Sequence, residues 1–107
     1  MGDRGNIKIT DGESTVFLYT HWCGSDLPEI VKAGLRLPEA RARWNDGYYL
    51  ARILFENLIA HGSSKETGFG ISSKIGDGED QILAIDINAQ TVRWREGKRV
   101  SFEAFTK

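Results

Sequence analysis

Residues 48–60 read YYLARILFENLIA, and this stretch decides the fold. Its apolar side chains cover most of the circumference of a helix and leave a narrow polar edge formed by Arg52, Glu56 and Asn57. We therefore predict a long, buried helix over residues 48–60. The two ends of the chain then have to fold around this central helix.

Strand patterns lie on both sides of the helix. On the N-terminal side, Asn6–Thr10 alternates apolar and polar residues, and Val16–His21 is rich in β-branched and aromatic residues, which predicts an antiparallel hairpin. On the C-terminal side, the strand candidates are Phe69–Ser72, Gln81–Ile87, Thr91–Trp94 and a short piece near Phe102 and Phe105. We expect these strands to form a meander, with Gln81–Ile87 in a central position because residues 82–87 are apolar at almost every position.

A first helix is predicted before the long one. Ser25 and Asp26 can cap its start, with Glu29 completing a capping-box pattern, and Gly34 is a candidate stop. Pro38–Arg41 favours one more helical turn. We expect Gly62 to end the long helix and Ser63–Thr67 to form a polar loop.

The resulting order is two strands, two helices and then three or four strands. At 107 residues the chain has the length of one ordinary domain. We predict a single α+β domain over residues 1–107, of order ββ-αα-βββ(β), with a predominantly antiparallel sheet and the helices packed on one of its faces.

Composition argues against several classes of protein. Fourteen basic and fifteen acidic residues give a net charge of −1, which argues against nucleic acid as the partner, although Arg93–Arg99 is a local basic patch containing Trp94. Cys23 is the single cysteine, which fits a reducing compartment. With no apolar signal segment and no membrane span in the sequence, we expect a cytoplasmic monomer or small homo-oligomer.

The segment from Tyr19 to Gly24 is the strongest local signal for chemistry. It leads from a predicted strand into a helix start, where the pKa of a thiol is lowered, so a thiol or hydrolytic enzyme using Cys23 and His21 is one hypothesis. His21, Cys23 and His61 lack the paired spacing of a zinc site, and no glycine cluster has the form of a nucleotide-binding loop. We therefore predict no metal, no cofactor and no defined catalytic residue.

Aromatic and basic residues form a second constellation, of the types that dominate binding hot spots. Its predicted binding residues are Tyr19, His21 and Trp22 at the strand end, with Arg43, Trp44, Tyr48 and Arg52 around the start of the long helix. The alternative is that Trp44 and one tyrosine only seal the sheet against the helix. A pocket between His21 and Tyr48 would instead suit a module that sequesters a small ligand.

Several blocks of the sequence form a distinctive pattern, namely MGDRGNI at residues 1–7, YTHW at residues 19–22 and RWNDGYYLARI at residues 43–53, with further parts in residues 66–71 and 86–92. In these blocks the chain resembles a family of short, uncharacterised proteins encoded by bacteriophages and bacterial mobile elements. The resemblance implies a small phage accessory protein in a bacterial host cell. Such a protein would bind and inhibit a host protein, and an anti-CRISPR or similar anti-defence inhibitor is the concrete form of this hypothesis.

Overall fold

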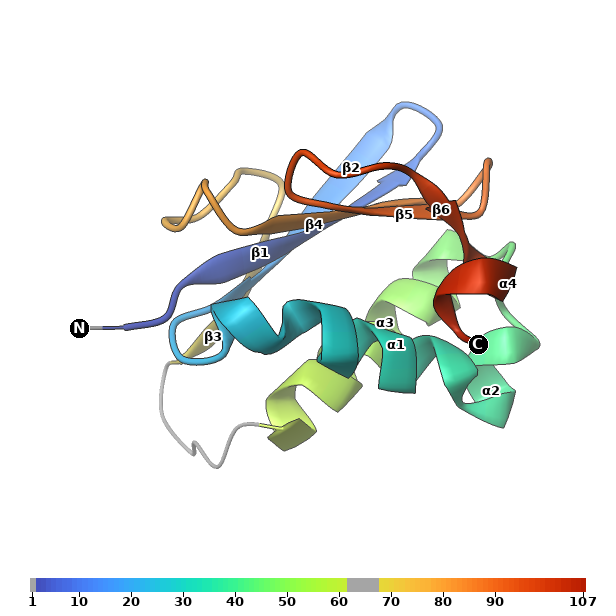
Figure 1. The fold of residues 1–107 in the computed structure, drawn as a ribbon, viewed down its shortest axis with the longest axis horizontal. Coiled ribbons are helices and arrows are strands. Elements are labelled where there is room, and N and C mark those ends of the chain that lie inside the picture. The colour runs from blue at the N-terminus through green and yellow to red at the C-terminus, as the bar shows by residue number, and fades with distance from the viewer. Residues whose placement is uncertain (1, 62–67) are drawn as a thin grey trace.

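The computed structural model describes residues 2–61 and 68–107. Six strands form one sheet, and the main helices pack against one of its faces (Figure 1). The elements in chain order are β1 (Gly5–Asp11), β2 (Ser14–Thr20), the 3-10 turn η1 (Gly24–Asp26), α1 (Leu27–Arg36), α2 (Pro38–Arg41), α3 (Gly47–His61), β3 (Phe69–Ser72), β4 (Ile82–Asp86), β5 (Thr91–Trp94), β6 (Val100–Ser101) and α4 (Phe102–Phe105). The strand order is β3-β2-β1-β4-β5-β6.

The sheet is predominantly antiparallel, as predicted. Neighbouring strands run in opposite directions at every pairing except that between β1 and β4, which are parallel. The α+β class is therefore confirmed, and the sheet is mixed because of this one central pair. Within the described ranges, no helix combines the length and the apolar character needed to span a bilayer.

The core lies between the helices and the two central strands. Ile7 and Ile9 of β1 are buried with the less buried Lys8 between them. Leu83 and Ile85 of β4 are buried with the less buried Ala84 between them, so one face of each strand points to the helices. The helices add residues spaced three or four apart, which is the spacing of one helix face. These are Leu27, Ile30, Val31 and Leu35 of α1 and Leu50, Ile53, Leu54 and Leu58 of α3.

The long helix lies where the sequence predicts it, but its burial is one-sided. Leu50 and Leu58 are fully buried, whereas Tyr48 is 91% exposed and Ile59 is 38% exposed. The sheet and α1 cover only part of the circumference of α3. The apolar residues of this helix extend beyond the covered part. The prediction of a buried helix is therefore wrong for this outer flank.

The predicted meander is confirmed for β4, β5 and β6, which pair in sequence order, and is wrong for β3. β3 pairs with β2 at one edge of the sheet, and β4 pairs with β1 in the centre. The connection over residues 73–81 crosses the face opposite the helices (Figure 1). The buried Asn6 side chain holds it there, because its amide donates to the carbonyls of Gly76 at 3.2 Å and Asp77 at 3.0 Å. The apolar strand β4 and its parallel neighbour β1 thereby take the two central positions.

Smaller differences occur at the helix ends. The side chain of Asp26 makes no capping hydrogen bond, so the capping box is absent, and the N–H of Ser25 donates to Asp3 instead. α1 continues past Gly34 to Arg36 and ends before Pro38, whose ring disfavours helical geometry in the preceding residue. The predictions for Gly62 and for Ser63–Thr67 lie outside the described residues.

The C-terminal end forms a helical turn where a strand was predicted. Phe102 and Phe105 belong to α4, and only Val100 and Ser101 pair with β5. The hydroxyl of Ser101 accepts the N–H of Ala104 at 3.1 Å, which caps the turn. The turn places Phe102 in the core, where it is 1% exposed.

Candidate functional site

The end of β2 holds Cys23 in an environment that favours the neutral thiol. The hydroxyl of Thr20 accepts the N–H groups of Trp22 and Cys23, both at 3.2 Å, and lies 3.0 Å from the Cys23 sulfur. Desolvation by burial raises the pKa of the Cys23 thiol, against the smaller lowering effect of the Thr20 hydrogen bond. Although the short η1 turn begins directly after Cys23, the net effect of its surroundings is a raised thiol pKa.

His21 is engaged with Arg4 rather than with Cys23. Its Nδ1 atom accepts the Nε–H of Arg4 at 3.1 Å and lies 3.1 Å from the Tyr19 hydroxyl. A guanidinium only donates, so this nitrogen carries a lone pair and the proton of the neutral ring lies on Nε2. Among the described contacts, no hydrogen bond joins His21 to Cys23, so the pairing of nucleophile and base that a thiol enzyme needs is not formed.

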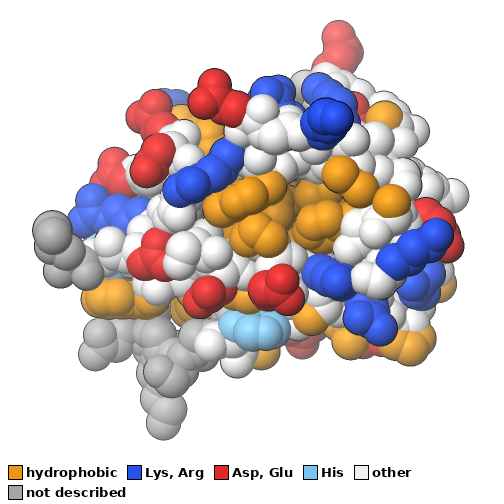
Figure 2. Space-filling model, in the orientation of Figure 1, with side chains coloured by type: hydrophobic (Ala, Val, Ile, Leu, Met, Phe, Trp, Pro, Cys, Tyr) orange, Lys and Arg blue, Asp and Glu red, His pale blue; other side chains and the backbone are white. Residues whose placement is uncertain are grey.

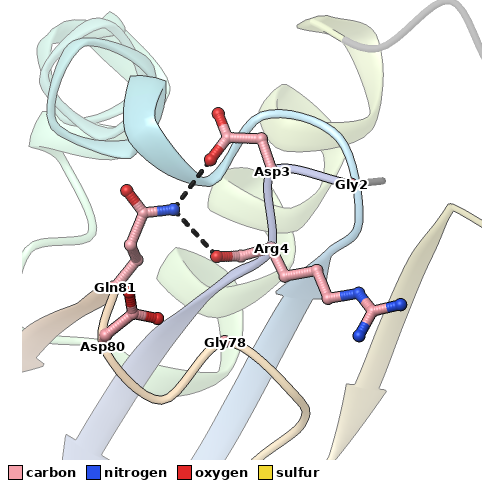
Figure 3. Close-up of a pocket in the computed structure, with 6 residues that line it drawn as sticks. All are labelled: Gly2, Asp3, Arg4, Gly78, Asp80 and Gln81. Atoms are coloured by element: carbon pink, nitrogen blue, oxygen red, sulfur yellow. Dashed lines mark hydrogen bonds between the residues drawn. The ribbon is translucent and has the colours of Figure 1, made fainter.

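A polar recess lies at the N-terminal ends of β1 and β4. It has a volume of about 470 Å³ and is lined by Gly2, Asp3, Arg4, Gly78, Asp80 and Gln81 (Figure 3). The Gln81 amide donates to the Asp3 carboxylate at 2.7 Å and to the Arg4 carbonyl at 2.9 Å. Hydrogen bonds from the side chains of Ser25 and Gln81 lower the pKa of Asp3. These polar groups tie the N-terminal segment to the start of α1 and to β4.

An apolar groove lies between the first turns of α3 and the outer part of the sheet. We call it the α3–β3 groove; its volume is about 290 Å³, and it is lined by Ile9, Asp11, Ser14, Thr15, Val16, Gly47, Tyr48, Ala51 and Ile71. A side chain at Gly47 would collide with the Asp11 carboxylate, so glycine lets the helix start close to the hairpin. Tyr48 is 91% exposed and Ile71 is 58% exposed at the groove.

The structure separates the predicted binding residues into two groups. Tyr48 lines the groove together with the first residues of β2, whereas His21 and Trp22 follow its last residue, Thr20. β2 has seven residues, and a strand of this length spans about 20 Å. The pocket expected between His21 and Tyr48 is therefore not formed, and each group has to be considered separately.

In the group at the end of β2, aromatic rings stack on one another. The rings of His21 and Trp22 meet edge to face with centroids 4.4 Å apart, and the ring of Tyr19 is tilted against that of His21 with centroids 6.5 Å apart. Trp22 is 55% exposed. This group therefore offers one large exposed ring next to the N-terminal segment.

In the group around α3, two of the predicted binding residues serve the fold. The indole N–H of Trp44 donates to the Leu35 carbonyl at 3.1 Å, and its ring packs edge to face on Phe102. This matches the alternative in which Trp44 seals the core. The guanidinium of Arg43 covers the ring of Tyr49, 4.6 Å from its centroid, so that neither side chain is fully available.

Tyr48 and Arg52 are the members of this group that project from α3. Arg52 forms an ion pair with Glu56 at 3.0 Å, one turn further along the helix. The Tyr48 side chain makes no hydrogen bond within the described residues, and its ring borders the groove. Sequence reasoning missed the apolar lining of this groove, above all Ile71, because no local pattern identifies β3 as an edge strand.

Comparisons with known proteins place the chain in no family. No protein-family model matches it, and no curated protein or solved structure is significantly similar to it. The resemblance to short phage proteins therefore stays a prediction. In the part of the chain that the structure describes, no three His, Cys, Asp or Glu side chains come together as a metal site would require.

Proposed function

We propose that this protein acts by binding another protein through the α3–β3 groove. The observation that supports this proposal is the exposure of Tyr48, 91% of whose surface is accessible beside a groove lined by Ile9, Val16 and Ala51. A tyrosine gives a large contact area at a low cost in conformational entropy. An apolar depression bordered by such a ring is the usual form of a binding hot spot.

The chemistry at the end of β2 favours binding over catalysis. The pKa of Cys23 is raised, which lowers the fraction of reactive thiolate at neutral pH. His21 accepts a hydrogen bond from Arg4, which would have to be broken before its Nδ1 could take a proton. Both features count against the thiol or hydrolytic enzyme hypothesis.

The charge distribution favours a protein partner over nucleic acid. Basic and acidic side chains are interspersed around a central apolar area on the face drawn in Figure 2, with no continuous basic track. The net charge of −1 adds no long-range attraction to phosphate. The partner we propose is a host protein, consistent with the phage-like sequence blocks. In this role the protein would bind a component of host defence and inhibit it.

The test begins with the parent protein as bait in a lysate of a bacterial host, followed by purification of the captured protein. The affinity of that partner is then measured for Tyr48→Ala and for a matched control, Trp22→Ala. Trp22 is also a large exposed ring, but it lies at the other end of β2. We expect Tyr48→Ala to weaken binding by about 1–2 kcal/mol, in the range of a hot spot, with an unchanged melting temperature.

Two outcomes would contradict the proposal. If Trp22→Ala weakens binding and Tyr48→Ala does not, the interface lies at the end of β2 and not at the groove. If native mass spectrometry of the freshly purified parent finds a tightly held small molecule that Tyr48→Ala releases, the groove sequesters a ligand. A fully folded Tyr48→Ala variant is expected in every case, because the ring contributes little to the core.

A further inference from the structure

β3 is an edge strand with an open outer side. It pairs with β2 and is the terminal strand in the order β3-β2-β1-β4-β5-β6. Among residues 2–61 and 68–107, no strand pairs with its other side. Its backbone groups on that side are therefore not used by any described strand.

The ladder between β2 and β3 determines which backbone groups face outward. The N–H of His21 donates to the carbonyl of Gly68 at 2.9 Å, so these two residues form a hydrogen-bonded pair. In an antiparallel ladder such pairs alternate with pairs that are not hydrogen-bonded. With the observed register, Gly70 and Ser72 bond to β2, and Phe69 and Ile71 direct their N–H and C=O groups to the open side.

The open side of β3 is continuous with the α3–β3 groove. Ile71 is the register partner of Leu18, which is fully buried under the helices, so the Ile71 side chain lies on the same face of the sheet. Ile71 also lines the groove beside Tyr48. Ile71 thus presents both outward-facing peptide groups and an apolar side chain that is 58% exposed.

The two edges of the sheet differ in their protection. At the opposite edge, β6 has two residues and leads directly into α4. β3 reads FGIS and contains neither a proline nor a charged residue, the usual devices that block pairing at an edge. The β3 edge is therefore the one suited to accept another strand.

We propose that the partner binds by adding an extended segment to β3 as a seventh strand. This inference rests on the proposed function and specifies the chemistry of the partner. The segment would pair with the peptide groups of Phe69 and Ile71, and its apolar side chains on the helix face would pack on Ile71 and Tyr48. Asp11 is the charged residue among those that line the groove, and no described ion pair neutralises it. The segment therefore carries Lys or Arg next to its apolar residues.

The first test uses a synthetic probe, the peptide Lys-Thr-Val-Thr-Val-Thr-Lys, and amide hydrogen exchange measured by NMR. In the protein alone, the amides of Phe69 and Ile71 should exchange faster than those of Gly70 and Ser72. Addition of the probe should slow exchange at Phe69 and Ile71 and shift the Tyr48 ring resonances. Slow exchange at Phe69 and Ile71 before addition, or no change up to the solubility limit of the probe, would overturn the inference.

Charge selectivity is tested with a second peptide in which glutamate replaces both lysines. The lysine peptide should bind more tightly, and Asp11→Asn should abolish the difference. Equal binding of the two peptides to the parent would overturn the choice of a basic segment.

A pair of variants separates the backbone of Ile71 from its side chain. Ile71→Pro removes an N–H that faces away from β2, so the native ladder is retained, whereas Ile71→Thr keeps the N–H and a β-branched side chain. We expect Ile71→Pro to weaken capture of the host protein by about tenfold or more relative to Ile71→Thr. Equal effects of the two variants, together with a loss on Tyr48→Ala, would overturn strand addition while leaving the proposed function in place. If none of the three variants alters capture, the proposed function itself fails.

A second copy of this chain is the other possible occupant. Sedimentation of the parent at increasing concentration should show a monomer. A dimer that Ile71→Pro dissociates would place two β3 strands side by side and overturn the assignment to a partner protein.

Discussion

Truncation of Leu54 tests the packing of α3 against α1. Leu54 is 1% exposed, and one of its methyl carbons would lie 2.8 Å from a β-carbon built on Gly34 of α1. Leu54→Ala removes buried methyl groups and leaves a cavity, a change that costs about 2–5 kcal/mol in well-packed cores. We expect about 3 kcal/mol, since neighbours on both helices restrict collapse around the site.

The same contact predicts a specific coupling with Gly34→Ala. In isolation the alanine would gain about 1 kcal/mol of helix propensity. In the parent its methyl group overlaps Leu54 and lies 3.1 Å from the Asn57 amide, which itself donates to the Ile30 carbonyl, and overpacking of this kind costs about 1–3 kcal/mol. Gly34→Ala should therefore destabilise the parent slightly and become neutral or stabilising once Leu54→Ala has removed the obstructing side chain.

The assay is urea unfolding of the four proteins of this double-mutant cycle, followed by far-ultraviolet circular dichroism. We expect a coupling free energy of about 1 kcal/mol or more between the two sites. Leu54→Ala should also lower the melting temperature by about 10 °C or more, as expected for a domain of this size. Ile59→Ala is the control on the same helix; it is 38% exposed, so its cost should be about 1 kcal/mol or less. If Gly34→Ala stabilises the parent and the two effects add, α1 and α3 do not meet at this point.

Three further perturbations follow from local contacts. The pKa of Asp3 is lowered by its hydrogen bonds with Ser25 and Gln81, so its contribution to stability is present above the ordinary Asp value and is lost as pH falls through the lowered folded value. Asp3→Asn should therefore lower the melting temperature at pH 7, and the gap to the parent should close in acid. The raised pKa of Cys23 predicts that iodoacetamide alkylates the folded protein much more slowly than the urea-unfolded protein at pH 8, and that Cys23→Ser retains partner binding. Gly78 has a φ of +88°, and a β-carbon there would lie 2.6 Å from the Arg4 backbone, so Gly78→Ala should cost about 2 kcal/mol.

Each of these perturbations has a result that contradicts it. A gap between Asp3→Asn and the parent that stays constant from pH 7 into acid would show that the carboxylate charge is not stabilising. Equal alkylation rates of the folded and unfolded protein would instead support the hypothesis that Cys23 is a reactive thiol. For Gly78→Ala, the control is Gly70→Ala, where the nearest atom to a built β-carbon is 3.9 Å away, and equal melting temperatures of the two variants would be the contradicting result.

The candidate site was only partly accessible to sequence reasoning. Tyr48 could be singled out because an aromatic residue at the start of a helix, next to arginines, is a frequent binding residue. Its neighbours in the groove could not, since Ile9, Val16 and Ile71 come from three strands whose order in the sheet is a tertiary property. The sequence also suggested one cluster of seven residues, and the structure divides it between the end of β2 and the region around the start of α3.

The sequence by itself determined most of the elements of this protein. Periodicity and turn residues act within a few positions, so the helix at 48–60, the N-terminal hairpin and the central character of residues 82–86 followed from local physics. Only the tertiary structure decided how the strands are ordered. In the structure β1 and β4 take the two central positions as a parallel pair, and the connection between β3 and β4 crosses the face opposite the helices, where Asn6 holds it by hydrogen bonds. That choice sends β3 to the edge beside Tyr48, and it is made by competition between distant segments for the same core.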